Sequence, residues 1–211
     1  THSDTETIVH AYEQWGPDCV QRLRGMFAFA LWDGGRERLV LARDRFGKKP
    51  MFLAQSDRAL VFGSEIKALL ASGVVSPVVN TAAVRDYFAY RYVPAPQTLF
   101  QGIRKLMPGH HLTLRVSGSK PQLQIEPYWN MPLPAASGQP AQEDSYWIRE
   151  TRRRLEETVR MRLMADVPLG MFLSGGLDSS AIAALIKRMV GGPVKTFSVG
   201  YQEAQYSELG Y

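Results

Sequence analysis

The stretch FLSGGLDSSAIAAL, residues 172–185, decides how the C-terminal part of this chain folds. An apolar segment runs into a Ser-Gly-Gly turn, and an Ala-rich apolar segment follows the turn. This order predicts a strand, a tight turn and a helix. A second apolar segment at residues 194–201 predicts another strand after the helix. Strand, helix and strand joined by short loops form a β-α-β unit with parallel strands, so we expect an α/β domain here.

The Ser-Gly-Gly turn has the chemistry of an anion site. Glycines let the main chain approach a ligand, and the amides at a helix start point outward at the positive end of the helix dipole. Ser174, Ser179 and Ser180 add hydroxyl groups. Asp178 would repel a phosphate unless Mg²⁺ bridged the two. The turn is neither a Walker A loop nor a G-x-G-x-x-G motif. The alternative is a turn that only packs a helix on a sheet.

Residues 1–129 show a different pattern, with helices and antiparallel hairpins. Residues 2–16 predict a helix with a capping box made by Ser3 and Glu6. Residues 81–93 predict another helix, ended by Pro94 and Pro96. Strand-like segments separated by turn residues predict three hairpins. Those hairpins span residues 25–44, 50–64 and 110–129.

Composition and charge limit the classes of protein. The chain has 211 residues, 45% hydrophobic and 21% charged, with a net charge of +5, which is ordinary globular composition. The basic residues are spread along the chain, so we expect no nucleic-acid partner. The densest run, Arg152 to Arg154, has helical spacing and predicts a solvated helix face. No apolar stretch is long enough for a membrane span.

The single cysteine, Cys19, excludes an intramolecular disulfide. A reducing, cytoplasmic compartment fits this cysteine usage and the absence of a signal peptide. We expect Cys19 to be half-buried. The two adjacent histidines, His110 and His111, would face opposite sides of a strand and could not bind one metal.

Residues 130–144 are the best linker candidate, because they are rich in proline and poor in regularly spaced apolar residues. We therefore expect one domain at residues 1–129, a linker at 130–144 and a second domain at 145–211. The expected fold class is α/β: an α+β sandwich of two sheets with helices, followed by the start of a parallel-sheet domain.

Several blocks of the sequence resemble one family. SGGLDSS resembles the PP-loop of N-type ATP pyrophosphatases. DVPLGMFLSGGLDSS followed by KTFSVGY resembles the synthetase domain of glutamine-hydrolysing asparagine synthetases. HSDTE, GMFAFALWD, LARDRFGKKPMF, FGSEIKALL and LMPGHHL are similar, in the same order, to the class II glutaminase domain of that family.

The resemblance implies a two-part enzyme. An Ntn-type glutaminase domain would release ammonia from glutamine. A PP-loop domain would use ATP and Mg²⁺ to activate aspartate as β-aspartyl-AMP, which ammonia converts to asparagine. The implied partners are the small molecules ATP, aspartate and glutamine, with a possible homodimer and no membrane.

The resemblance also implies roles for particular residues. Asp4 would bind the amino group of glutamine; the alternative is an acidic residue placed at a helix start by the dipole. Asp178 would hold Mg²⁺ through ATP. Arg43, Asp44 and Arg45 would form structural ion pairs. The residues implied to bind ATP are Leu173, Ser174, Gly175, Gly176, Asp178, Ser179, Ser180 and Val199. For Leu173 and Val199 the alternative is core packing.

The chain departs from the family at its first residue. The nucleophile of class II glutaminases is an N-terminal cysteine, whereas position 1 is Thr, beside the SD block. We therefore expect no catalytic residue in this chain, which would be an internal fragment without activity of its own. Rival interpretations are a β-lactam-forming synthetase, an amidotransferase acting on another carboxylate, and a non-catalytic scaffold protein.

Overall fold

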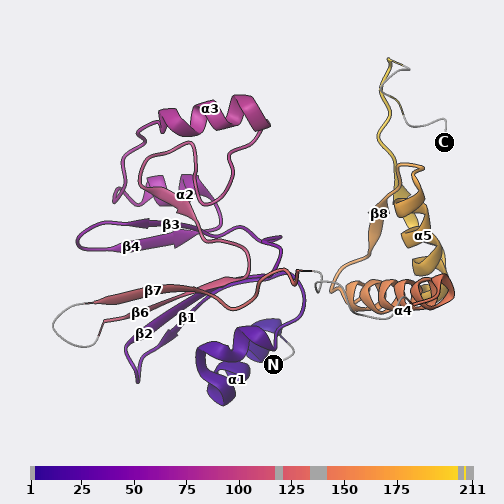
Figure 1. The fold of residues 1–211 in the computed structure, drawn as a ribbon, viewed down its shortest axis with the longest axis horizontal. Coiled ribbons are helices and arrows are strands. Elements are labelled where there is room, and N and C mark those ends of the chain that lie inside the picture. The colour runs from indigo at the N-terminus through magenta and orange to yellow at the C-terminus, as the bar shows by residue number, and fades with distance from the viewer. Residues whose placement is uncertain (1–2, 117–120, 134–141, 204–206, 208–211) are drawn as a thin grey trace. The chain divides into compact units, whose positions relative to one another are not determined.

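A computed structural model describes residues 3–116, 121–133, 142–203 and 207. The chain divides into two compact units, Thr1–Leu133 and Pro134–Tyr211 (Figure 1). Within the described residues, no helix is both long enough and apolar enough to span a bilayer.

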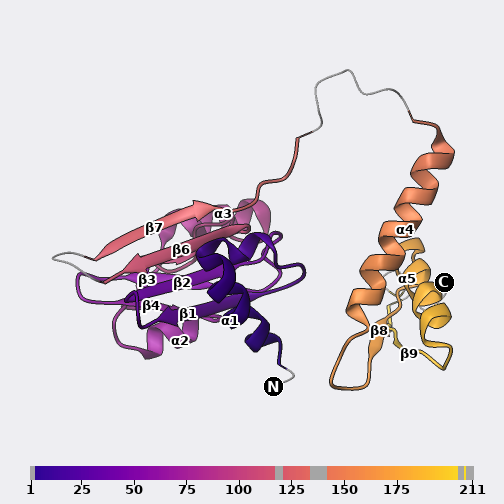
Figure 2. The ribbon, with the colours of Figure 1, turned by 90° about the horizontal axis from the view of Figure 1, so that it is seen from below.

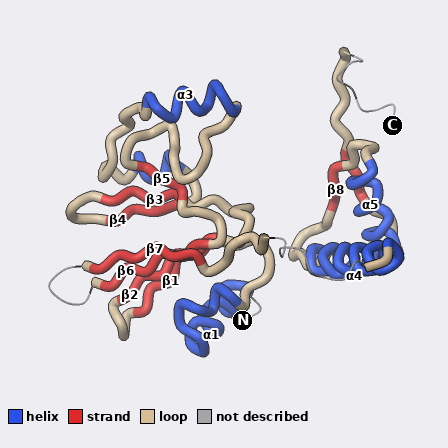
Figure 3. Tube along the Cα trace, viewed as in Figure 1, coloured by secondary structure: helices blue, strands red, loops and turns tan. Residues whose placement is uncertain are grey.

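Unit 1 is built on two antiparallel sheets (Figure 3). The first sheet has the order β1-β2-β6-β7 and the second has the order β4-β3-β5. The strands are β1 (Ala28–Asp33), β2 (Arg38–Arg43), β3 (Phe52–Gln55), β4 (Leu60–Gly63), β5 (Ile103–Lys105), β6 (His110–Arg115) and β7 (Gln122–Pro127). The three predicted hairpins are confirmed as β1–β2, β3–β4 and β6–β7.

Side-chain burial shows how the layers stack. Leu41 of β2 is buried with Leu53 of β3, so the two sheets pack face to face. Val40, on the opposite face of β2, is buried against Tyr12 of helix α1 (Asp4–Trp15). Helix α2 (Ile66–Ala71) covers the second sheet through Leu69. The order helix, sheet, sheet, helix confirms the expected sandwich of two sheets with helices.

Two helix ends differ from the sequence prediction. Ser3 does cap α1, but its hydroxyl accepts from the amide of Thr5 at 3.2 Å instead of that of Glu6. Helix α3 (Thr81–Tyr90) ends at Arg91, before the prolines. Arg91 has a φ of 62° and donates its amide to the Tyr87 carbonyl at 2.7 Å. A single left-handed residue therefore ends α3, and such a residue has no strong signature in sequence.

The expectation that Cys19 is half-buried is wrong. Its accessible surface is 0%, because the 3₁₀ helix η1 (Gly16–Gln21) follows α1 directly and places the side chain against β2. Burial also raises the pKa of the Cys19 thiol. A buried thiol with a raised pKa is a packing residue and a poor nucleophile.

The loop after β2 is held by hydrogen bonds to the main chain, and among the described residues the expected ion pairs of Arg43, Asp44 and Arg45 are not found. The buried Asp44 accepts from the amides of Lys48 and Lys49, each at 2.9 Å, and from that of Phe46 at 3.2 Å. Arg43 donates to three carbonyls, those of Lys49, Gly47 and Leu106. Both charged groups are satisfied by peptide dipoles, so the loop is structural.

Unit 1 ends in an aromatic anchor. The Tyr128 hydroxyl donates to the Arg43 carbonyl at 2.7 Å, and burial raises the pKa of Tyr128 to about 12. The Trp129 ring lies 5.2 Å from that of Phe46. Gly109 has a φ of +67°, and a Cβ there would lie 2.5 Å from the Trp129 carbonyl oxygen. The chain can therefore fold back over residue 109 only because it is glycine.

Unit 2 contains the predicted β-α-β arrangement. Its elements are α4 (Asp144–Arg162), β8 (Gly170–Phe172), α5 (Leu177–Val190) and β9 (Lys195–Phe197). Strands β8 and β9 pair in parallel, from Gly170↔Lys195 to Phe172↔Phe197, and α5 makes the crossover between them (Figure 2).

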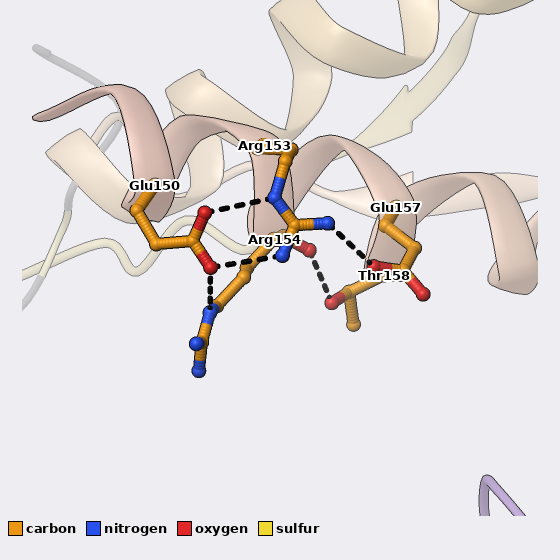
Figure 4. A network of polar contacts seen from close by, with 5 residues as sticks. All are labelled: Glu150, Arg153, Arg154, Glu157 and Thr158. Carbon is orange, nitrogen blue, oxygen red and sulfur yellow. Dashed lines mark hydrogen bonds and ion pairs between the residues drawn. The ribbon is translucent and has the colours of Figure 1, made fainter. Parts of the chain in front are cut away.

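The arginines of α4 form the solvated face that the sequence predicts. Figure 4 shows Glu150 accepting from Arg153 and Arg154, while Arg153 also reaches Glu157. These contacts are three or four residues apart, as neighbours on a helix surface are. Hydrogen bonds from Arg153 and Arg154 lower the pKa of Glu150 to about 2.

His111 is a buried titratable group in the first sheet. It is 8% exposed, and its Nδ1 atom has no hydrogen-bond partner among the described residues. Its Nε2 atom lies 3.9 Å from a carboxylate oxygen of Glu126. Burial lowers the pKa of His111, with a smaller contribution from His110, against the opposing charges of Glu126 and Asp18.

We predict that His111 makes unit 1 less stable as the pH falls. Below the ordinary pKa of 6.5 the unfolded chain binds the proton first, so the free energy of unfolding decreases until the lowered folded-state pKa is passed. Urea unfolding between pH 8 and 5 should show a steeper loss in the parent than in His111→Gln. The exposed His10, whose pKa is raised by Glu13, is present in both the parent and the variant, so its titration contributes equally to both slopes. Equal slopes would contradict this assignment.

Candidate functional site

The candidate site lies where β8 passes into α5. Residues 173–176 form the loop, and the amide of Leu173 still pairs with the Phe197 carbonyl at 2.8 Å. The loop therefore leaves from the carboxyl ends of two parallel strands. Ligands of open α/β sheets bind at this edge.

The loop itself is a turn with a left-handed glycine at its centre. Gly175 has a φ of +77°, which favours glycine, and Gly176 is the N-cap of α5. The Ser179 hydroxyl donates to the Gly176 carbonyl at 3.1 Å and lies 3.2 Å from that of Ser174. The contact between the two hydroxyls therefore joins the loop, through Ser174, to the first turn of α5, through Ser179.

Main-chain amides are presented at the mouth of this turn. The first helical bond of α5 is from Ser180 to the Gly176 carbonyl at 3.0 Å. The amides of the three preceding residues, Leu177 to Ser179, therefore lie before the hydrogen-bonded part of the helix. Gly175, Gly176 and Asp178 are exposed. An exposed helix start with a left-handed glycine before it is a suitable receptor for a phosphate group.

A pocket of about 390 Å³ opens beside the loop. It brings together Leu173, Ser174 and Val199, which the sequence analysis had assigned to one ligand. Val199 is 57% exposed, so its side chain is not a core residue, whereas Leu173 is half-buried. The other lining residues are Phe172, Phe197, Ser198 and Tyr201.

Sequence reasoning missed those four lining residues. An isolated aromatic residue or serine at a strand end has no signature of its own. The register of β8 against β9 is what places them around one pocket, and that register is set by pairing between distant segments.

Asp4 belongs to unit 1. It is the exposed first residue of α1, and its Oδ1 atom lies 3.5 Å from the hydroxyls of Ser3 and Thr5. Thr1, the residue at the first position of the chain, lies outside the described residues. Within the described part of the chain, no three His, Cys, Asp or Glu side chains gather as a metal site.

Comparisons with known proteins agree with both units. Residues 1–129 match a family model described as a glutamine amidotransferase domain, and residues 150–211 match one described as asparagine synthase. An asparagine synthetase (glutamine-hydrolysing) of Bacillus subtilis is 38% identical over 208 residues, covering 95% of this chain and 32% of its own length. A putative asparagine synthetase of Mycobacterium tuberculosis is 39% identical, covering 99% of this chain and 32% of its own length.

The chain belongs to the family of glutamine-hydrolysing asparagine synthetases. It spans about a third of the length of these relatives. An amidase of Penicillium rubens, chyE, is also similar, at 36% identity over 87% of this chain and 26% of its own length. A solved structure of glutamine phosphoribosylpyrophosphate amidotransferase from B. subtilis aligns with a TM-score of 0.42 at 15% identity, over 96% of this chain and 41% of that one.

The loop geometry predicts unequal effects for two glycine substitutions. Gly175→Ala should destabilise the start of α5 by about 1 kcal/mol, because its φ of +77° is unfavourable for a residue with a Cβ. Gly192→Ala is the control, since a Cβ there would have its nearest neighbour at 4.0 Å. Hydrogen exchange of the α5 amides measures both. Equal protection in the two variants would contradict the described turn.

Proposed function

We propose that this chain carries part of the machinery of an ATP-dependent carbon–nitrogen ligase that amidates aspartate to asparagine with ammonia from glutamine. One observation carries the proposal: the segment that matches asparagine synthases presents exposed amides and hydroxyls beside a pocket at the carboxyl ends of two parallel strands. Main-chain amides and hydroxyls at a helix start are suitable donors for the phosphate groups of a nucleoside triphosphate.

The residues present fit ATP with Mg²⁺. Leu173 and Val199 would contact the adenosine part in the pocket. The loop amides and the hydroxyls of Ser174, Ser179 and Ser180 would hold phosphate oxygens. Asp178, exposed in the first turn of α5, would hold Mg²⁺ through the phosphates. The metal would neutralise the negative charge that the carboxylate and the phosphates share.

The reaction needs this arrangement for a chemical reason. The carboxylate of aspartate has no adequate leaving group, and transfer of AMP to it supplies one. Negative charge increases on the phosphates as pyrophosphate leaves. Amide donors fixed at a helix start can stabilise that charge without reorganising.

Unit 1 would serve the supply of ammonia. In the proposal, residues 1–129 are a part of the glutaminase domain, residues 130–144 are a linker, and Asp4 pairs with the amino group of glutamine. Cys19 does not provide the nucleophile, because its thiol is fully buried and its pKa is raised. The loop held by Arg43 and Asp44 supports the sheets and takes no part in the chemistry.

A second candidate is amidation of a different carboxylate. Its support is that some relatives, at 36% and 35% identity, are named amidases and not asparagine synthetases. The loop chemistry would be the same in both cases, because transfer of AMP to a carboxylate, with release of pyrophosphate, can activate either acceptor. The two candidates therefore differ in the acceptor and not in the nucleotide site.

We predict that Asp178→Asn weakens ATP binding only when Mg²⁺ is present. With Mg²⁺, the variant should bind ATP about tenfold more weakly than the parent, because it loses a carboxylate that holds the metal. With EDTA in place of Mg²⁺, it should bind at least as well as the parent, because the repulsion between carboxylate and phosphate is gone. Isothermal titration of the full chain with ATP measures both.

Asp57→Asn is the matched control. It removes the same charge from an exposed turn of unit 1 and should leave ATP binding unchanged under both conditions. Absence of any ATP binding by the parent would refute the nucleotide site. Equal weakening of Asp178→Asn with and without Mg²⁺ would refute the role assigned to Asp178.

A further inference from the structure

The β8–β9 ladder ends in an unusual way beside the pocket. In a parallel ladder, a residue donates to one neighbour and accepts from the residue two positions further along the partner strand. Leu173 donates to the Phe197 carbonyl at 2.8 Å, so its own carbonyl is the acceptor to which the Val199 amide would donate next. Instead, the Ser198 hydroxyl donates to the Leu173 carbonyl at 2.7 Å.

The main-chain amide of Val199 lies beyond the last bond of the ladder. Among the described residues it makes no hydrogen bond, although Val199 lines the pocket of about 390 Å³ and is 57% exposed. We propose that Ser198 is a positioning residue: its hydroxyl ends the ladder one rung early and keeps the main-chain N–H of Val199 available to the ligand in the pocket.

The hydrogen bond from Ser198 to the Leu173 carbonyl affects which main-chain donors a ligand can reach. A ligand at the carboxyl end of a parallel pair must compete with the next rung of the ladder for main-chain donors. A side-chain hydroxyl that satisfies the carbonyl of one strand removes that competition, while the bond from Leu173 to Phe197 still holds the strands in register. The Val199 amide is then a rigid donor for an acceptor atom on the ligand, which we take to be ATP on the basis of the proposed function.

Three variants test this role by ATP binding. Ser198→Ala should bind Mg²⁺–ATP about threefold to tenfold more weakly than the parent, the value of one hydrogen bond. Ser198→Thr keeps the hydroxyl and should restore binding. Ser72→Ala is the control, because Ser72 also donates to a main-chain carbonyl, that of Leu69 at 2.6 Å, but in unit 1. Its ATP affinity should equal that of the parent.

Hydrogen exchange separates this role from a merely structural one. In the ligand-free parent, the Val199 amide should exchange nearly unprotected while the Leu173 amide is protected. In Ser198→Ala, the Val199 amide should become protected, because it can now donate to the Leu173 carbonyl. Protection of Val199 in the ligand-free parent would overturn the inference, as would unchanged ATP affinity in Ser198→Ala.

Failure of the proposed function gives a different result. If the parent does not bind ATP, the proposed function fails, yet the exchange of Val199 still decides whether Ser198 ends the ladder. If the parent binds ATP and Val199 exchanges slowly, the nucleotide site stands and the role of Ser198 is refuted.

Discussion

The parallel pairing of β8 with β9 is the constraint on which the candidate site depends. The bond from the Leu173 amide to the Phe197 carbonyl is the last rung of that pairing. Parallel strands cannot be joined by a tight turn, so a crossover helix must leave from the carboxyl end of the first strand. That requirement places the start of α5, with its outward-pointing amides, directly beside the open end of both strands.

Main-chain groups also organise unit 1, in a different way. There the half-buried Arg43 donates to main-chain carbonyls, including that of Gly47, and the buried Asp44 accepts from main-chain amides of the same loop. In unit 2, residues 174–178 and Ser180 are exposed and Ser179 is half-buried. The same kind of donor is thus used inside the first unit for stability and at the surface of the second for binding.

Local features of the fold could be predicted from the sequence. The hairpins follow from strand-like segments next to turn residues, and the β-α-β unit follows from the glycine turn between an apolar strand and an apolar helix. Strand β5 was not predicted, because Ile103–Lys105 is too short to show an alternating pattern. Full burial of Cys19 could not be predicted either, since it depends on η1 packing against β2.

In the candidate site, too, local features could be predicted from the sequence and contacts between distant segments could not. Ser174, Gly175 and Ser179 stand close together in the sequence, and the structure joins them in one turn. Ser198 lies 25 residues from the carbonyl to which it donates. Its contact exists only once two distant strands pair in a particular register, and no local pattern reveals it. The solvated arginines of α4 were predictable because their partners are one helical turn away.

If the proposed function is correct, the loop between β8 and α5 binds a chain of phosphate groups through its amides. The most direct measurement is a titration of the ¹⁵N-labelled chain with Mg²⁺ and inorganic pyrophosphate, followed by amide chemical shifts. We expect the largest saturable shifts to fall on residues 175–180. Shifts that gather instead on the arginines of α4, or no saturable shift at the loop, would contradict it.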